Sequence, residues 1–194
     1  MRTEMIALIG KVGVGKSTFL RNSGLKKEKI FICDEFVAKE YKKYGILYNE
    51  IKQKIGTFLL DEKGVSKKKI LKWLFENTDN IDKLERVVFP KIFDAIKNGN
   101  FAIVEIPVLV NKNFNFLSLF SAVLCLSTSE QKRWKNIQKR SVDKLTIKAI
   151  DQKNSTILAK NQLFGQIPVV DIYLENFESY DRNKKILDLV KLIN

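Results

Sequence analysis

Short apolar runs alternate along the chain with longer stretches of helical periodicity. A short, mostly apolar run bounded by polar residues is typical of a strand in a parallel sheet, which is buried on both faces. The helical stretches between such runs predict an α/β fold with a doubly wound, parallel five-stranded sheet. The five runs that predict its strands are Met5–Ile9, Ile30–Cys33, Phe101–Ile106, Ala122–Leu126 and Val169–Leu174.

Two helices are expected outside the middle of the chain, one early and one late. The first runs from about Gly15 to Asn22, with Gly24 as its stop signal. The second covers Ser179–Ile193 and is amphipathic. Its inward residues are expected to be Ile186, Leu189, Val190 and Ile193.

A long helical segment separates the second strand from the third. Residues 36–100 amount to roughly 65, far more than a minimal crossover needs, and we interpret them as a helical substrate-binding insert. Helices are expected over Phe36–Tyr44, within 46–77 and over Asp79–Lys97, where Pro90 should kink or split the helix. Three sets of residues are each expected to share one helix face, namely Val37, Tyr41 and Tyr44, then Ile51, Ile55, Phe58 and Leu59, then Ile70, Leu71, Leu74 and Phe75.

The segment Gly10-Lys-Val-Gly-Val-Gly-Lys16-Ser17 follows the first strand directly and fits the phosphate-binding pattern G-x-x-x-x-G-K-[ST]. Its glycines tolerate positive φ, so successive N–H groups can point inward and, with the following helix, form a cup for phosphate. Lys16 would bridge the β- and γ-phosphates, and Ser17 would bind Mg²⁺. The sequence therefore predicts that ATP and Mg²⁺ bind at Gly10, Lys11, Val12, Gly13, Val14, Gly15, Lys16, Ser17 and Thr18.

Three carboxylates lie at or directly after the carboxyl ends of predicted strands, the edge where ligands bind in open α/β sheets. Asp34 and Glu35 come after the second strand, and Glu105 lies near the end of the third. The first two could position or deprotonate an acceptor hydroxyl, contact Mg²⁺ through water, or cap the following helix. Glu105 could position Mg²⁺ or substrate, or be structural.

A basic segment follows the fourth strand, after the helix-capping signal Ser127-Thr-Ser-Glu130. Cations here could stabilise the negative charge of a phosphoryl group in the transition state of its transfer. Arg133 and Arg140 are the better candidates because a planar guanidinium matches phosphate geometry. The alternative for each basic residue is a solvated helix face.

The net charge of +13 raises the question of nucleic-acid binding. Of the 35 basic residues, 29 are lysines and 6 are arginines, and they are spread along the whole chain. Specific nucleic-acid surfaces rely more on arginine, so we expect no nucleic-acid partner. A basic surface also suits a polyanionic small substrate.

The remaining composition narrows the chemistry and the setting. With no histidine, a general base must be a carboxylate, Lys, Tyr or water. Cys33 and Cys125 fall on separate predicted strands and should not pair, which suits a reducing cytoplasm. No apolar run approaches the roughly 20 residues of a transmembrane helix, and the start of the chain has no signal-peptide pattern.

Several of these segments together resemble the dephospho-CoA kinase family. The family patterns G-G-I-G-S-G-K-S, D-A-D-x-x-A-R and H-P-x-I are similar to Gly10–Ser17, Cys33–Lys39 and Phe89–Ile92. The pattern V-P-L-L-F-E is similar to Ile106-Pro-Val-Leu-Val-Asn111, with the final acid replaced. The patterns Q-x-x-R…R-D, a later Gln, and A-D-x-V-I-x-N are similar to Gln131…Arg133…Arg140, Gln152 and Val170–Asn176.

The resemblance implies ATP-dependent phosphorylation of the ribose 3′-hydroxyl of dephospho-CoA, the last step of coenzyme A biosynthesis. It aligns the family's presumed base with Glu35 and puts Asp34 at a small-residue position, so both stay candidates. It implies substrate contacts at Glu105, Pro107 and Leu109, with 36–100 holding the substrate and 127–165 acting as a lid. The alternatives are another P-loop nucleoside or nucleotide kinase and a nonenzymatic nucleotide-binding module.

Overall fold

The computed structural model describes residues 5–138, 156–174 and 180–192. The chain divides into two compact units. Unit 1 comprises Met1–Phe31, Asn100–Val110 and Phe116–Asn194, and unit 2 comprises Ile32–Gly99 and Asn111–Asn115. The helical insert expected over 36–100 therefore belongs to unit 2, apart from its last residue.

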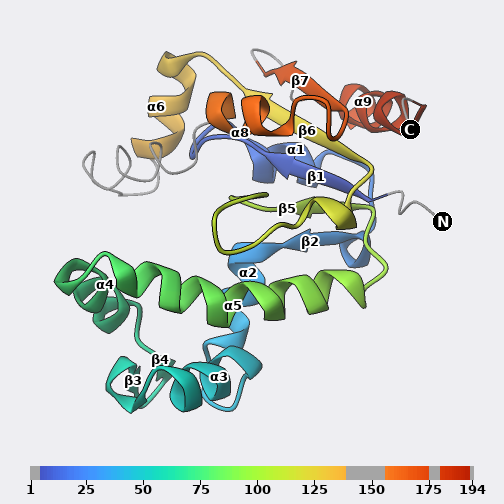
Figure 1. Cartoon of the computed structure of the whole chain (residues 1–194). Helices are drawn as coiled ribbons and strands as arrows, with labels where there is room; N and C mark the ends of the chain where they lie inside the picture. The colour runs from blue at the N-terminus through green and yellow to red at the C-terminus, as the bar shows by residue number, and fades with distance from the viewer. Residues whose placement is uncertain (1–4, 139–155, 175–179, 193–194) are drawn as a thin grey trace. The chain divides into compact units, whose positions relative to one another are not determined.

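Unit 1 is built on the predicted five-stranded parallel sheet, and its strand order is β2-β5-β1-β6-β7 (Figure 1). Its strands are β1 (Ile6–Ile9), β2 (Ile30–Ile32), β5 (Ile103–Glu105), β6 (Ala122–Ser127) and β7 (Val169–Tyr173). β1 pairs in parallel with β5 on one side and β6 on the other. Because the strand order changes direction at β1, the loop after this strand lies at the position where such sheets bind ligands.

The core of unit 1 surrounds the central strands. All four residues of β1 are buried, and so are the first five of β6, which explains why these strands appear in the sequence as continuous apolar runs. The remaining elements of unit 1 are α1 (Lys16–Arg21), η1 (Lys27–Lys29), η3 (Leu117–Leu119), α6 (Glu130–Gln138), α8 (Thr156–Leu163) and α9 (Tyr180–Leu192).

One expectation about the last helix needs correction. In α9 Val190 is buried as expected, but the other buried leucine is Leu187, whereas Leu189 is 60% exposed. Three-residue spacing between Leu187 and Val190 keeps both on one face of the helix.

Unit 2 is mainly helical, as expected, and also contains a hairpin that the sequence did not predict. Figure 1 shows its longest helix, α5, in green. Pro90 lies inside α5, which continues as one helix of 19 residues. The elements are α2 (Cys33–Glu40), α3 (Ile46–Lys54), η2 (Thr57–Leu59), β3 (Leu60–Asp61), β4 (Gly64–Val65), α4 (Lys67–Glu76) and α5 (Asp79–Lys97).

The boundary between β2 and α2 differs from the prediction. Cys33 is the first residue of α2 rather than the last of the strand. The helix ends at Glu40, where the Glu40 carboxylate accepts a hydrogen bond of 2.8 Å from the backbone N–H of Ile46. Tyr44, expected within this helix on the same face as Val37 and Tyr41, has φ of 70° and is 77% exposed. The chain turns here instead of continuing the helix.

The apolar stripes of unit 2 were predicted only in part. Ile51, Leu59 and Ile70 are buried as expected. Three further residues from these stripes are more than half exposed, namely Phe58, Leu71 and Phe75. Helix α3 ends at Lys54, so the helical period that related Ile51 to Phe58 does not continue to Phe58. Leu71 and Phe75 lie in α4 with Ile70, on a side of that helix that is exposed.

Candidate active site

The loop between β1 and α1 has the backbone conformation that its glycines predict. Gly13 and Gly15 have φ of 86° and 104°, in the left-handed region that side-chain-bearing residues rarely adopt. Gly15 is the N-cap residue of α1, and Lys16 and Ser17 are the first residues of the helix. The loop thus leads directly into a helix N-terminus, where backbone N–H groups favour bound anions.

Lys16 folds back over this loop. Its Nζ donates hydrogen bonds to the carbonyl oxygen of Gly10 at 2.7 Å and to that of Lys11 at 3.3 Å. The same ammonium lies 3.7 Å from Oε1 of Glu105, and the two side chains are 14% and 16% exposed. The register of the sheet explains why Lys16 and Glu105 lie close together, because Glu105 pairs with Leu8, two residues before the loop begins.

The side chains of Ser17 and Thr18 are exposed at the start of α1. Hydroxyl and carboxylate oxygens are the ligand types that Mg²⁺ prefers, with phosphate and water completing its shell. Ser17 and Glu105 fit that chemistry. In the part of the chain that the structure describes, no group of three His, Cys, Asp or Glu side chains is arranged to hold a metal ion.

Helix α6 packs against the loop through Arg133. This residue is only 3% exposed, and its Nε donates a 2.8 Å hydrogen bond to the carbonyl oxygen of Val12. Its Nη1 lies 3.0 Å from Oε2 of Glu130 on the same helix. Arg133 therefore does not lie on a solvated helix face, which was the alternative that the sequence left open. Its contact with a phosphoryl group stays a prediction.

Asn136 is a loop contact that the sequence patterns did not single out. Its Nδ2 donates a 2.8 Å hydrogen bond to the carbonyl oxygen of Gly13. Asn136 follows Arg133 by three residues and so lies on the same helix face. That spacing is the signal in the sequence that could have identified it.

Asp34 and Glu35 belong to unit 2 and occupy the first turn of α2. Both are exposed. The N-cap position is Ile32, without a side-chain capping bond, so the capping interpretation of this pair is wrong. Acidic side chains in a first helical turn interact favourably with the helix dipole. Their exposure keeps both carboxylates accessible to a substrate.

Pro107 and Leu109, expected to contact substrate, follow β5 in unit 1. Pro107 is exposed, whereas Leu109 is buried. The carbonyl oxygen of Leu109 accepts a 2.9 Å hydrogen bond from the N–H of Phe116. Leu109 thus packs in the core of its unit, and Pro107 alone of the two presents its side chain to solvent.

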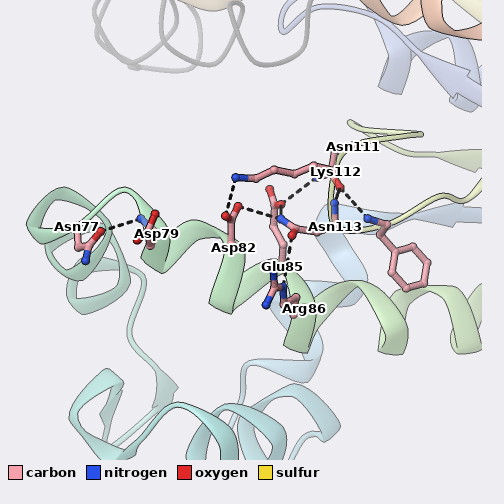
Figure 2. A network of polar contacts seen from close by, with 9 residues as sticks. Asn77, Asp79, Asp82, Glu85, Arg86, Asn111, Lys112 and Asn113 are labelled. Carbon is pink, nitrogen blue, oxygen red and sulfur yellow. Dashed lines mark hydrogen bonds and ion pairs between the residues drawn. The ribbon is translucent and has the colours of Figure 1, made fainter.

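Within unit 2, Asn111 connects the short segment 111–115 to α5, as Figure 2 shows. Its Nδ2 donates to Oε2 of Glu85 at 2.9 Å, while its Oδ1 accepts hydrogen bonds from the N–H groups of Asn113 and Phe114. An acid here, as in the resembled family, could not donate to Glu85. The replacement by Asn therefore suits the carboxylate on α5.

Neighbouring contacts strengthen the same connection. Nδ2 of Asn113 donates to Asp82 at 2.9 Å and to Glu85 at 2.8 Å. Nζ of Lys112 lies 2.6 Å from Oδ2 of Asp82. The hydrogen bond from Lys112, followed by that from Asn113, lowers the pKa of the Asp82 carboxyl below its usual value. We call these residues, with Glu85 and Asn111, the α5 clamp.

Several expected residues lie outside the described ranges, namely Arg140, Gln152, Asn176 and Ile193, together with part of the expected lid over 127–165. Both cysteines are described and buried, and they form no disulfide with each other. Burial raises the pKa of the Cys125 thiol to about 11. Of the helices described, none combines the length and the apolar character needed to cross a membrane.

Comparison with known proteins gives a consistent result. A family model described as dephospho-CoA kinase matches residues 4–176. The dephospho-CoA kinase of Mycoplasma genitalium is 29% identical over 162 residues, covering 79% of this chain and 81% of the relative. That of Fusobacterium nucleatum is 24% identical over 202 residues, covering 100% and 96%. Dephospho-CoA kinase from Campylobacter jejuni matches in fold, with a TM-score of 0.60, 19% identity and 99% coverage of both chains.

Proposed function

The chain belongs to the dephospho-CoA kinase family, and on this premise we propose that it transfers the γ-phosphoryl group of ATP to the ribose 3′-hydroxyl of dephospho-CoA. The products are coenzyme A and ADP, so the reaction completes coenzyme A biosynthesis. The observation that supports binding of the phosphate donor is the loop itself, whose left-handed glycines lead from the carboxyl end of β1 to Lys16 at the start of α1. The family match supports the choice of acceptor.

The loop would bind the phosphates of ATP through its backbone N–H groups and the N-terminus of α1. On binding, Lys16 exchanges its bonds to the carbonyl oxygens of Gly10 and Lys11 for phosphate oxygens. Its positive charge then offsets the charge that develops on the transferred group. Glu105, close to Lys16, would orient this ammonium during the exchange.

Mg²⁺, when bound with ATP, neutralises charge on the β- and γ-phosphates. Ser17 is the residue that we propose to hold it, through its exposed hydroxyl at the second position of α1. Glu105 is proposed to position either a water molecule of the ion or the substrate. Hard oxygen ligands of this kind suit Mg²⁺.

In the chemical step the 3′-oxygen of the acceptor forms a bond to the γ-phosphorus as the bond to the β–γ bridging oxygen breaks. The hydroxyl proton passes to a carboxylate, for which we propose Glu35 or Asp34, since histidine is absent from the chain. Arg140 is proposed to contact the phosphoryl group. Residues 36–100 are proposed to hold the acceptor and 127–165 to close over the nucleotide.

The test uses the purified chain with ATP, Mg²⁺ and dephospho-CoA, and detects coenzyme A by its mass. We expect product to form at a rate that depends on Lys16. Lys16→Ala should reduce kcat by about 10²-fold or more, while Lys27→Ala, at an exposed position in η1, should retain wild-type turnover. Absence of coenzyme A with the wild-type chain would refute the proposal, and equal turnover in both variants would remove the loop from the mechanism.

A further inference from the structure

We propose that Arg133 and Asn136 are positioning residues, which hold the peptide groups of the phosphate-binding loop in a fixed orientation from the side that packs against α6. This inference rests on the proposed function, because it assigns to α6 a role in preparing the loop for ATP. Each residue binds one of two consecutive loop carbonyls, those of Val12 and Gly13. Each bond thereby fixes the direction of the N–H group in the same peptide unit.

The geometry of a trans peptide makes this coupling direct, because its C=O and N–H groups point in opposite directions. The carbonyl of Val12 shares its peptide with the N–H of Gly13, and the carbonyl of Gly13 shares its peptide with the N–H of Val14. Because both carbonyls accept hydrogen bonds of 2.8 Å from α6, both N–H groups point away from this helix. The directions of both N–H groups are thus set before a ligand arrives, and the N–H of Val14 donates a 3.4 Å hydrogen bond to the carbonyl oxygen of Lys11, which a phosphate oxygen would replace.

Arg133 is well suited to hold its carbonyl in place. A buried guanidinium is costly unless it is paired and hydrogen-bonded. Glu130 supplies the paired charge, with Oε2 at 3.0 Å and Oε1 at 3.3 Å from Nη1. The side chain is only 4% exposed, so its position is determined by protein contacts.

Packing at Gly13 provides independent support. A Cβ atom at this position would lie 2.7 Å from Cγ1 of Ile137 and 2.9 Å from the carbonyl oxygen of Arg133. The loop backbone at Gly13 therefore lies directly against the side chain of Ile137 and the backbone carbonyl of Arg133 in α6. This close approach makes the two hydrogen bonds possible, and it limits rotation of the peptides that they hold.

This role differs from that of an arginine that contacts the phosphoryl group only in the transition state. A positioning residue acts on the ground state, since a loop with freely rotating peptides loses more entropy when it binds phosphate. Removing it should weaken ATP binding itself. Removing a transition-state contact should lower kcat and leave the dissociation constant of ATP unchanged.

The experiment measures the dissociation constants of ATP and of inorganic tripolyphosphate by calorimetry. Asn136→Ala and Arg133→Gln are compared with the wild-type chain and with Gln138→Ala, an exposed position on the same helix. We expect each of the two variants to weaken both ligands by about 10-fold, the value of one hydrogen bond. Gln138→Ala should bind as the wild-type chain does. Amide ¹H–¹⁵N resonances of Gly13 and Val14 should shift in the two variants before ligand is added.

Equal binding of both ligands by Asn136→Ala and the wild-type chain would overturn the inference. Because Arg133 is buried, Arg133→Gln is interpreted only if thermal unfolding shows that it folds; otherwise Asn136→Ala decides. A fall in kcat of Arg133→Lys with unchanged ATP binding would identify a transition-state contact instead. No binding of ATP by the wild-type chain would refute the proposed function, whereas failure to phosphorylate dephospho-CoA alone leaves this binding test intact.

Discussion

Nζ of Lys16 lies 3.7 Å from Oε1 of Glu105, and both side chains are largely shielded from solvent. Lys16 is the first residue of α1, directly after the loop that follows β1, and Glu105 is the last residue of β5. Parallel pairing of these strands brings the two residues together, although they lie far apart in the chain. This ion pair holds the ammonium of Lys16 at the carboxyl end of β5.

Glu105→Gln tests what the carboxylate contributes. The substitution keeps the size of the side chain and removes the charge beside Lys16, so orientation of the ammonium and of Mg²⁺ should suffer. We expect kcat/KM for ATP to fall by roughly 10- to 100-fold, measured by coupled ADP release. Glu28→Gln, at an exposed position of η1, is the control. A Glu105→Gln enzyme within twofold of wild type would show that the carboxylate is structural.

Gly13→Ala tests the close contact between the loop and α6. Alanine at this position would have to adopt the left-handed backbone conformation of Gly13, with φ of 86°, and its Cβ would also overlap Ile137. Gly165→Ala is a matched control, because Gly165 has φ of 72° but a Cβ added there would meet no atom within 4 Å. Backbone strain should cost about 1–2 kcal/mol in both variants, and overlap should add about 1–3 kcal/mol in Gly13→Ala.

Chemical denaturation of the two glycine variants measures this difference. We also expect Gly13→Ala to lose ATP binding while Gly165→Ala keeps it. Equal stability of the two variants would contradict the packing that we describe at Gly13.

Asp34→Asn and Glu35→Gln, made separately, identify the base. Both positions are exposed in the first turn of α2, so neither substitution should disturb the fold. The residue that accepts the proton should lose about 10²-fold or more in kcat, and the other should lose much less. The measurement is kcat at saturating ATP and dephospho-CoA. If neither variant loses more than a few-fold, the proton goes elsewhere.

The α5 clamp predicts a pH-dependent contribution to stability. Lys112 and Asn113 lower the pKa of Asp82 in the folded state, below the value of about 3.9 for an unfolded chain. The folded state therefore gains stability above about pH 4 and loses it as the pH falls through the lowered pKa. The Tm difference between the wild-type chain and Asp82→Asn should be largest near neutral pH and should shrink below pH ~4.

Asp94→Asn, at an exposed position of the same helix, provides the control for that experiment. Its Tm should stay close to that of the wild-type chain across the same pH range. A constant Tm difference for Asp82→Asn from neutral pH down to about pH 2 would contradict the assigned role of the Asp82 carboxylate.

Local patterns in the sequence were sufficient to predict the parallel sheet and the conformation of the phosphate-binding loop. Buried parallel strands are apolar on both faces, so β1 and β6 are evident as short runs. The loop pattern requires glycines at fixed spacing because of its backbone, and φ at Gly13 and Gly15 agrees. These features depend on a few neighbouring residues.

Other features depend on contacts that no local pattern contains. The bond between Arg133 and Val12 joins residues 121 positions apart, so the sequence could identify the arginine but not its partner. The strands β3 and β4 have two residues each, too few for an alternating pattern to be visible. Cys33 continues an apolar run, and α2 begins there without a capping side chain to mark its start.

The central claim is that this chain phosphorylates dephospho-CoA in preference to other acceptors. The most direct measurement is kcat/KM for ADP release with dephospho-CoA, adenosine, AMP and shikimate, each as the sole acceptor with ATP and Mg²⁺. We predict that dephospho-CoA exceeds every other acceptor by at least ~10²-fold, in keeping with the discrimination available to a site that binds polar groups of its substrate. Turnover with a nucleoside, nucleotide or shikimate that equals or exceeds turnover with dephospho-CoA would contradict it.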